Sequence, residues 1–260
     1  MEHVLNTAFV DKIRQKIPAV GCQLRSHSFR IAELMGFCGF DFLYIDTEHY
    51  TCGPETIENL VRCCQLSNAA SLVRIPDHDP GKISQYLDAG VTGIILPHLD
   101  TAEEARAAIK AGKYGPKGER GFSGNARSAH YGFVDRTTYS TQANDNTLII
   151  GMIESMTAVE NLDAILDSGI DALRIGPSDL AASMGLDGRS KEPAVQKVVD
   201  EILKKCNRAG VPVGGAASTV DETIAQFDRG FDFVHYSSDL VTLERHWRSG
   251  LAEIHQRLGQ

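Results

Sequence analysis

Short hydrophobic runs alternate with amphipathic stretches along the whole chain, and this alternation predicts strands and helices in turn. Eight apolar runs predict strands over residues 19–24, 41–46, 71–75, 91–97, 147–154, 172–176, 211–215 and 231–236. Helical spacing predicts helices over residues 28–35, 54–67, 81–89, 102–111, 158–168 and 193–209, and a last helix over 240–258. Most of these helices end at a glycine, the usual residue just past a helix end.

Eight strands that alternate with helices predict one α/β domain, a (β/α)8 TIM barrel over residues 1–260. A doubly wound dinucleotide-binding sheet is the competing fold, but no predicted strand runs into a G-x-G-x-x-G turn. Residues 112–146 predict one long loop insertion, with a short helix at 133–143. A loop of this length is usually functional or carries structure of its own.

Composition narrows the classes of protein and partner. With 26 basic and 34 acidic residues the net charge is −8, so the overall field repels nucleic acid and anionic lipid. No apolar run is long enough to cross a membrane, and the charged N-terminal segment lacks a signal-peptide core. Six cysteines without CxxC spacing predict buried or half-buried thiols in a reducing compartment. We therefore expect a cytoplasmic protein that acts on small molecules.

Chemistry in a barrel is carried at the C-terminal ends of the strands, and two acidic residues stand at neighbouring ends. Glu154 ends the fifth predicted strand, and strand alternation places Glu154 and Met152 on its inner face. Asp179 follows the sixth strand. Two carboxylates completed by water predict a site for Mg²⁺ or Mn²⁺ rather than zinc. The alternatives are solvated loop acids, or a cap by Asp179 on the turn 180–184.

Three further side chains each have a functional and a structural interpretation. Arg74 lies in an apolar strand and needs an anion, which is either a substrate or a structural carboxylate. His49 follows the second strand and is either a base or a satisfied structural group. Asp88, on the predicted helix 81–89, would ordinarily be a surface acid.

Several motifs occur in one order between about Gly21 and Asp239. They are DFLYIDTEH, LVRIP, ISQYLDAGVTGIILP, GPKGERG, IES and IGPSDLAASMG. In combination they resemble the HpcH/HpaI aldolase family. The resemblance implies a metal-dependent class II aldolase, which makes or breaks the carbon–carbon bond of a 4-hydroxy-2-oxo acid. The products would be pyruvate, or an analogue, and an aldehyde, formed through a metal-stabilised enolate.

The resemblance also implies cofactors, assembly and residue roles. The cofactor would be Mg²⁺, Mn²⁺ or Co²⁺, and the assembly a homohexamer arranged as a trimer of dimers. Glu154 and Asp179 would hold the metal, His49 would be the general base oriented by Asp88, Arg74 would bind the keto-acid oxygens, and the Ser178 backbone N–H would hold the carboxylate. Met152 and Asp179 would also line the substrate site. No lysine stands at a strand end, which disfavours a Schiff-base aldolase.

Three departures from the family pattern concern the pocket. Met152 stands where glutamine is usual, Arg174 replaces an apolar residue, and His235 with Tyr236 replaces a small or apolar pair. Arg174 either lies beside Met152 on the inner face, with Glu154 or a substrate carboxylate as partner, or points outward between helices. Two other functions stay open: an oxaloacetate decarboxylase-type lyase on the same scaffold, and a catalytically silent barrel that binds a 2-oxo acid.

The insertion carries Arg120, Arg127 and His130 in a chain of negative net charge. One interpretation is that residues 115–132 pack near a barrel mouth, their own or a neighbour's, and contribute to substrate binding. The other is a solvated or interface loop.

Overall fold

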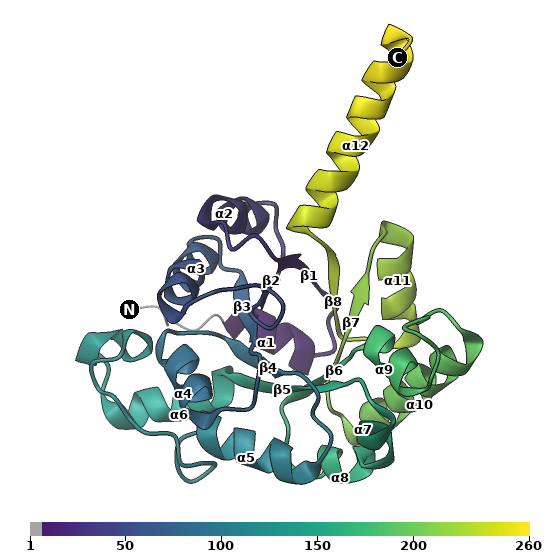
Figure 1. Cartoon of the computed structure of the whole chain (residues 1–260). Helices are drawn as coiled ribbons and strands as arrows, with labels where there is room; N and C mark the ends of the chain where they lie inside the picture. Colours follow the sequence, from purple (N-terminus) through teal and green to yellow (C-terminus); the bar gives the residue numbers. More distant parts are fainter. Residues whose placement is uncertain (1–6) are drawn as a thin grey trace.

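The computed structural model describes residues 7–260 and shows eight parallel strands closed into a barrel in sequence order (Figure 1). The strands are β1 (Ala19–Leu24), β2 (Phe42–Asp46), β3 (Ala70–Arg74), β4 (Gly93–Leu96), β5 (Leu148–Ile153), β6 (Ala172–Ile175), β7 (Val213–Ala217) and β8 (Phe233–Ser238). Each begins and ends within two residues of its predicted position. The predicted (β/α)8 fold is confirmed.

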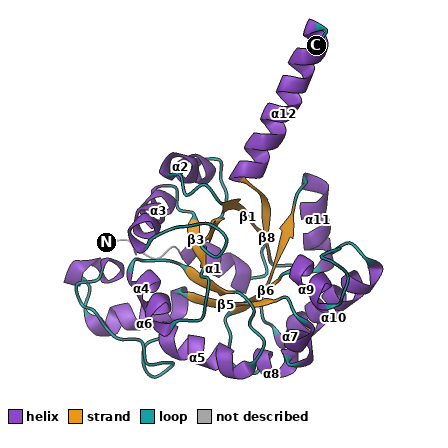
Figure 2. Cartoon of the chain, viewed as in Figure 1, coloured by secondary structure: helices purple, strands orange, loops and turns teal. Residues whose placement is uncertain are grey.

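Helices surround the strands (Figure 2). Six match predicted helices closely: α2 (Phe29–Phe37), α3 (Pro54–Leu66), α4 (Pro80–Asp88), α5 (Ala102–Gly112), α10 (Pro193–Ala209) and α12 (Asp239–Leu258). The predicted helix 158–168 is divided at Asn161 into α7 (Met156–Glu160) and α8 (Leu162–Leu166). Sequence periodicity did not predict α1 (Thr7–Arg14), α9 (Pro177–Ser183) or α11 (Val220–Arg229).

Alternate residues of each strand build two separate cores. One set packs between the strands and the outer helices, and the other fills the barrel interior. Helix α1 closes the N-terminal end of the barrel, where the Phe9 ring lies 5.0 Å from Phe42 and 5.8 Å from Phe233 between centroids. The chemistry is therefore confined to the opposite end, at the C-terminal ends of the strands.

The insertion between α5 and β5 folds around a small core of its own. It contains the 3-10 helix η1 (Arg127–Gly132) and α6 (Arg136–Asn146), which fulfils the expectation of a short helix here. Tyr114, Ala129 and Tyr139 are buried together. A segment from a helix end to the next strand start lies at the N-terminal end of the barrel. The insertion therefore does not reach its own barrel mouth, and that part of the prediction is wrong.

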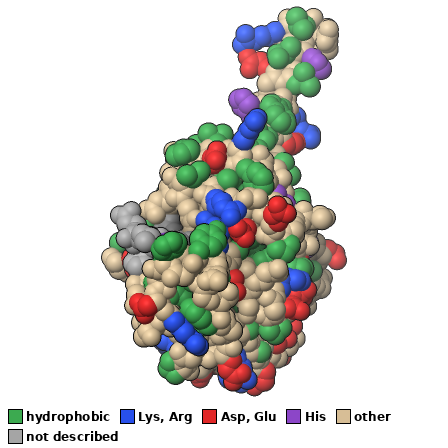
Figure 3. Space-filling model, turned by 90° about the vertical axis from the view of Figure 1, so that its left-hand side faces the viewer, with side chains coloured by type: hydrophobic (Ala, Val, Ile, Leu, Met, Phe, Trp, Pro, Cys, Tyr) green, Lys and Arg blue, Asp and Glu red, His purple; other side chains and the backbone are tan. Residues whose placement is uncertain are grey.

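The last helix, α12 (Asp239–Leu258), leaves the barrel between α2 and α11 and projects away from it (Figure 1). Within α12, all of which the structure describes, Asp239 is the one buried residue. Four exposed apolar residues, Trp247, Leu251, Ile254 and Leu258, share one face at helical spacing. Figure 3 shows hydrophobic side chains exposed on the protruding helix.

No helix among residues 7–260 has the length and hydropathy needed to cross a membrane. The cysteines of the described chain form no disulfide; four are buried, Cys52 is half-buried and Cys38 is exposed. The exposure of Cys38 departs from the prediction, because the residue follows α2 on the outer surface.

Candidate active site

Glu154 lies at the centre of the barrel mouth, directly after β5. Its predicted inward orientation is seen in the strand below it, where Ile150 and Met152 belong to the interior core. The residue is 2 % exposed, and its Oε1 accepts a hydrogen bond of 2.7 Å from the backbone N–H of His98. Its Oε2 is buried and has no hydrogen-bond partner within residues 7–260. Burial raises the pKa of Glu154, the charge of Asp179 raises it further, and the His98 amide opposes both.

Gly176, at the end of β6, leaves the space that this carboxylate occupies. A Cβ at position 176 would lie 2.4 Å from Oε2 and 2.8 Å from Cβ of Glu154. The Met152 side chain closes the same space from below, with its Cε 3.3 Å from that position. A glycine is therefore required here because the Glu154 side chain lies too close for a Cβ. The backbone conformation does not require it, since a φ of −102° suits any residue.

We expect Gly176→Ala to lower kcat/KM by about 10²-fold, because the added methyl must displace the Glu154 carboxylate by roughly 1 Å. The measurement is steady-state turnover, together with thermal unfolding to follow the fold. Gly121→Ala is the matched control, since a Cβ there meets no atom within 4 Å. Equal activity in both variants would show that the position of Glu154 is not critical.

Asp179 lies in the first turn of α9, exposed at the mouth. The helix begins at Pro177 with Gly176 as its N-cap, so the predicted alternative of a cap by Asp179 at 180–184 is not seen. A buried carboxylate oxygen without a partner, close to a second carboxylate, suits a divalent cation. No group of three or more metal-binding side chains occurs in the described part of the chain, so water or substrate would complete the coordination.

Arg74 ends β3 with its side chain 9 % exposed and is held by two carboxylates. Its Nε and NH2 donate to Asp46 at 3.1 and 2.5 Å, and its NH1 lies 2.7 Å from Glu48. Burial works to raise the pKa of Asp46, but the hydrogen bonds and charge of Arg74 outweigh it and lower that pKa. The anionic partners of Arg74 within the chain are thus the structural carboxylates of Asp46 and Glu48. One N–H on each terminal nitrogen of the guanidinium remains available to a ligand.

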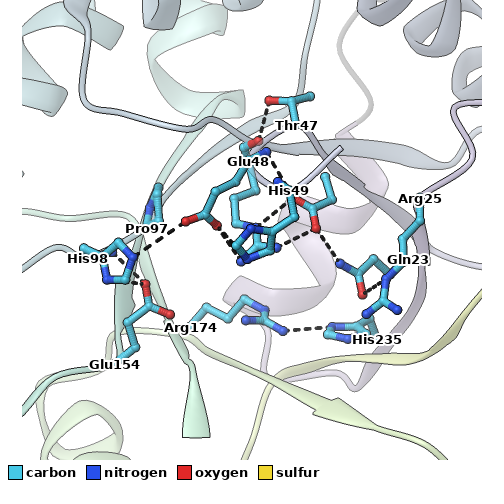
Figure 4. A network of polar contacts seen from close by, with 12 residues as sticks. Gln23, Arg25, Thr47, Glu48, His49, Pro97, His98, Glu154, Arg174 and His235 are labelled. Carbon is cyan, nitrogen blue, oxygen red and sulfur yellow. Dashed lines mark hydrogen bonds and ion pairs between the residues drawn. The ribbon is translucent and has the colours of Figure 1, made fainter. Parts of the chain in front are cut away.

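Two histidines meet at Glu48 (Figure 4). His49 Nε2 lies 3.7 Å from Glu48 Oε2, and His98 Nε2 lies 3.7 Å from Glu48 Oε1. His98 Nδ1 is also 3.3 Å from Glu154 Oε1. Both imidazoles are more than 60 % exposed, so each can reach a ligand in the mouth. Sequence reasoning missed His98; the only signal is its place just after β4.

Asp88 does not meet His49 within one chain. α4 starts beside the C-terminal end of β3 and runs back along the barrel, so Asp88, its last residue, lies at the opposite end. There it forms a 2.6 Å ion pair with Arg120, whose side chain is fully buried. No hydrogen bond or ion pair joins Asp88 to His49, both of which the structure describes. The predicted pairing of Asp88 with His49 therefore requires Asp88 from a second copy of the chain.

Arg174 points into the barrel, which excludes the outward alternative. It is 7 % exposed and lies beside Met152 in the β5–β6 register. Its NH2 donates to His235 Nδ1 at 3.2 Å, and its guanidinium lies 4.9 Å from the Tyr44 ring centroid. The expected direct partner Glu154 is not within 4.0 Å, although Arg174 is near enough to lower its pKa. Sequence reasoning did not foresee Tyr44 and His235 as its neighbours.

A cleft of about 880 Å³ opens beside these residues at the ends of β1, β6, β7 and β8. Gln23, Arg25, Ser178 and His235 contribute to its wall. Ser178 is the second residue of α9, where a backbone N–H has no partner within the helix. Arg25 and Arg245 give the cleft a basic rim, which can hold a negatively charged small molecule.

Comparisons with known proteins agree with this geometry. The sequence profile described as HpcH/HpaI aldolase/citrate lyase matches residues 20–245. The 2-dehydro-3,6-dideoxy-6-sulfogluconate aldolase of Pseudomonas putida is 34% identical over 231 residues, which are 88% of this chain and 89% of that protein. The 2-keto-3-deoxy-L-rhamnonate aldolase of Salmonella gallinarum is 36% identical over 231 residues, 87% of this chain and 84% of that protein. The crystal structure of an HpcH/HpaI aldolase from Desulfitobacterium hafniense superposes with a TM-score of 0.90 at 27% identity, over 95% of this chain and 96% of the other.

Proposed function

The chain belongs to the HpcH/HpaI aldolase/citrate lyase family and is a carbon–carbon lyase, and from this premise we propose that it is a metal-dependent class II aldolase. Its substrate is a 4-hydroxy-2-oxo acid, which it cleaves to pyruvate, or an analogue, and an aldehyde, or forms in the reverse direction. The observation that carries the proposal is the buried, unpartnered Oε2 of Glu154 beside Asp179 at the mouth of the barrel.

Glu154 and Asp179 hold the divalent ion, Mg²⁺, Mn²⁺ or Co²⁺. When bound, such an ion polarises the ketone and carboxylate oxygens of the 2-oxo acid. Gly176 admits the Glu154 carboxylate, and the His98 amide fixes its other oxygen. These contacts hold one carboxylate oxygen free before any ligand arrives, which reduces the reorganisation that binding requires.

Arg74 and Ser178 bind the 2-oxo acid. Asp46 and Glu48 fix the plane of the Arg74 guanidinium, and its two remaining N–H groups point to the keto-acid oxygens. The backbone N–H of Ser178, at the start of α9, donates a hydrogen bond to the carboxylate of the 2-oxo acid. His49 removes the proton of the C4 hydroxyl during cleavage and returns it during synthesis. Met152 packs beneath Glu154 and sets the floor of the substrate site.

In the decisive experiment the protein is incubated with pyruvate and each of a panel of aldehydes in the presence of Mg²⁺, Mn²⁺ or Co²⁺. The aldol products are identified by mass spectrometry. Exchange of the pyruvate C3 protons in D₂O reports enolate formation without any aldehyde. We expect metal-dependent exchange and an aldehyde-dependent product. Metal-dependent CO₂ release from oxaloacetate without an aldol product would instead favour the decarboxylase function. Binding of a 2-oxo acid with neither reaction would mark a silent barrel.

The chain assembles with copies of itself in this proposal. In a complete barrel the helix after β8 covers the wall between α11 and α2. Here α12 projects instead, while Leu34 and Phe37 of α2, with Val220 and Ile224 of α11, stay exposed on either side. The exposed apolar face of α12, formed by Trp247, Leu251, Ile254 and Leu258 and here called the apolar stripe, packs on this uncovered wall of a second copy. A hexamer built as a trimer of dimers, and a cytoplasmic location, remain predictions.

We expect the double variant Leu251→Lys/Ile254→Lys to lower the molar mass in light scattering, because two charges would enter the apolar stripe. Gln256→Lys is the matched control, since residue 256 lies on the opposite face of α12. A wild-type protein that elutes as a monomer, or a double variant that keeps the wild-type mass, would show that the stripe is not an interface.

A further inference from the structure

Arg174 is placed where a substrate would meet the barrel interior. It shares the inner face of β6 with Ala172 and Gly176, between Met152 of β5 and Gly214 of β7. Its side chain extends across the floor of the mouth toward His235 (Figure 4). His235 in turn contributes to the wall of the large cleft. The guanidinium thus contacts His235, a residue that itself lines the cleft.

The side chains that contact Arg174 supply no negative charge, and Glu154 lies beyond 4.0 Å, although it is near enough for Arg174 to lower its pKa. Burial raises the pKa of Tyr44 to about 12, so its phenol is neutral. Burial, followed by the charge of Arg174, lowers the pKa of His235 well below its usual value, so the imidazole is neutral and accepts at Nδ1. Within residues 7–260 no carboxylate lies within 4.0 Å of this guanidinium. Arg74, by contrast, is bound by both Asp46 and Glu48.

A buried arginine without a contacting anion carries charge that the ring face of Tyr44 and the more distant Glu154 offset only in part. Met152 and Gly214, on either side, offer no charged side chain to this guanidinium. The cleft wall adds Arg25 and Arg245, which form no ion pair with a described residue. Its other two basic side chains are paired, Lys191 with Glu222 at 2.8 Å and Arg229 with Asp200 at 2.7 Å. The local field therefore favours a ligand with more than one negative group.

We propose that Arg174 binds a second carboxylate of the substrate, one beyond the carboxylate of the 2-oxo acid, and so selects dicarboxylic substrates. This inference rests on the proposed function and adds the substrate class. Arg174 donates one hydrogen bond to His235. Its remaining N–H groups donate to the second carboxylate, which lies beside His235. The second carboxylate belongs either to the 2-oxo acid or to the aldehyde, and the same guanidinium recognises both.

A binding experiment tests the 2-oxo-acid source without turnover. Lactate and malate are unreactive analogues that differ by one carboxylate, and their Kd values are measured by calorimetry on the Mg²⁺-loaded protein. We expect wild type to bind malate about 10–100-fold more tightly than lactate, the value of a hydrogen-bonded charge pair. Arg174→Met should remove this difference, and Arg174→Lys should keep part of it.

A kinetic experiment tests the aldehyde source. Succinic semialdehyde and butanal have the same chain length and differ by one carboxylate, and kcat/KM is measured for each with pyruvate. A selectivity of about 10–100-fold in wild type that Arg174→Met removes would assign the second carboxylate to the aldehyde. Arg25→Met is the control for the general positive field of the mouth, because Arg25 lines the same cleft at a more exposed position.

The outcomes separate this inference from the proposed function. If wild type lacks pyruvate proton exchange, the aldolase proposal fails, and malate selectivity still decides the role of Arg174. If both selectivities are absent, or persist in Arg174→Met, the inference is wrong. An equal loss for charged and neutral partners would also overturn it, since that pattern marks a packing role. If Arg174→Met and Arg25→Met reduce the selectivity equally, the selectivity comes from the general positive field of the mouth and not from a specific site at Arg174.

Discussion

Glu154→Gln is expected to lose the bound metal and to lower kcat/KM by about 10³-fold or more, because a metal contributes several kcal/mol of transition-state stabilisation. Metal content after gel filtration and turnover are the two measurements. Asp179→Asn should behave in the same direction. The amide keeps the shape of the side chain and removes a buried charge, so thermal stability without metal should not fall.

The matched control is Glu160→Gln, which makes the same substitution on an exposed position of α7. It should retain its metal and its turnover. Full wild-type activity in excess chelator would contradict the metal mechanism, whatever the variants do. Retained metal with lost activity in Glu154→Gln would instead give Glu154 a role apart from coordination.

His49→Ala is expected to lower kcat by roughly 10²–10⁴-fold, the usual contribution of a positioned general base. A base must be unprotonated to act, so wild-type activity should fall at acid pH, and the variant should lose this limb of its kcat–pH profile. A merely structural histidine would not change the shape of that profile.

His98 is the competing base, because it is as exposed as His49 and lies at the same distance from Glu48. His98→Asn tests it, since asparagine tolerates the left-handed backbone at this position, where φ is 48°. The variant keeps the backbone N–H that holds Glu154. We expect a smaller loss than in His49→Ala. A larger loss, together with the missing limb, would transfer the role of base to His98.

Strand alternation predicted the position of Glu154 because a two-residue period leaves only two orientations and one end of a strand must open to solvent. The same reasoning put Arg174 beside Met152 as one of two alternatives, and packing selected it. The eight strands were predictable for a related reason, since most of them are apolar runs buried on both faces.

Helix α11 was missed although its sequence carries the usual signals, with Thr219 at its N-cap and Gly230 just past its end. The backbone conformation of His98, by contrast, could not be predicted, since nothing in the local sequence indicates a left-handed histidine. The interpretation that placed the insertion at its own barrel mouth is wrong because it considered the basic composition of the segment and not the direction of the chain; a neighbour's mouth stays a prediction. A segment between a helix and the next strand returns to the N-terminal end of the barrel. Asp88, at the end of α4, is separated from His49 for the same topological reason.

In the proposed assembly, the protruding α12 makes the stability of the enzyme depend on its concentration. A helix with Trp247, Leu251 and Ile254 in water is stabilised when another protomer covers it, and that cover is governed by mass action. The melting temperature should therefore rise with protein concentration, and dilution should release protomers whose barrel wall is incomplete between α2 and α11. For such a protein, the unit that unfolds on heating is the assembly and not the single chain.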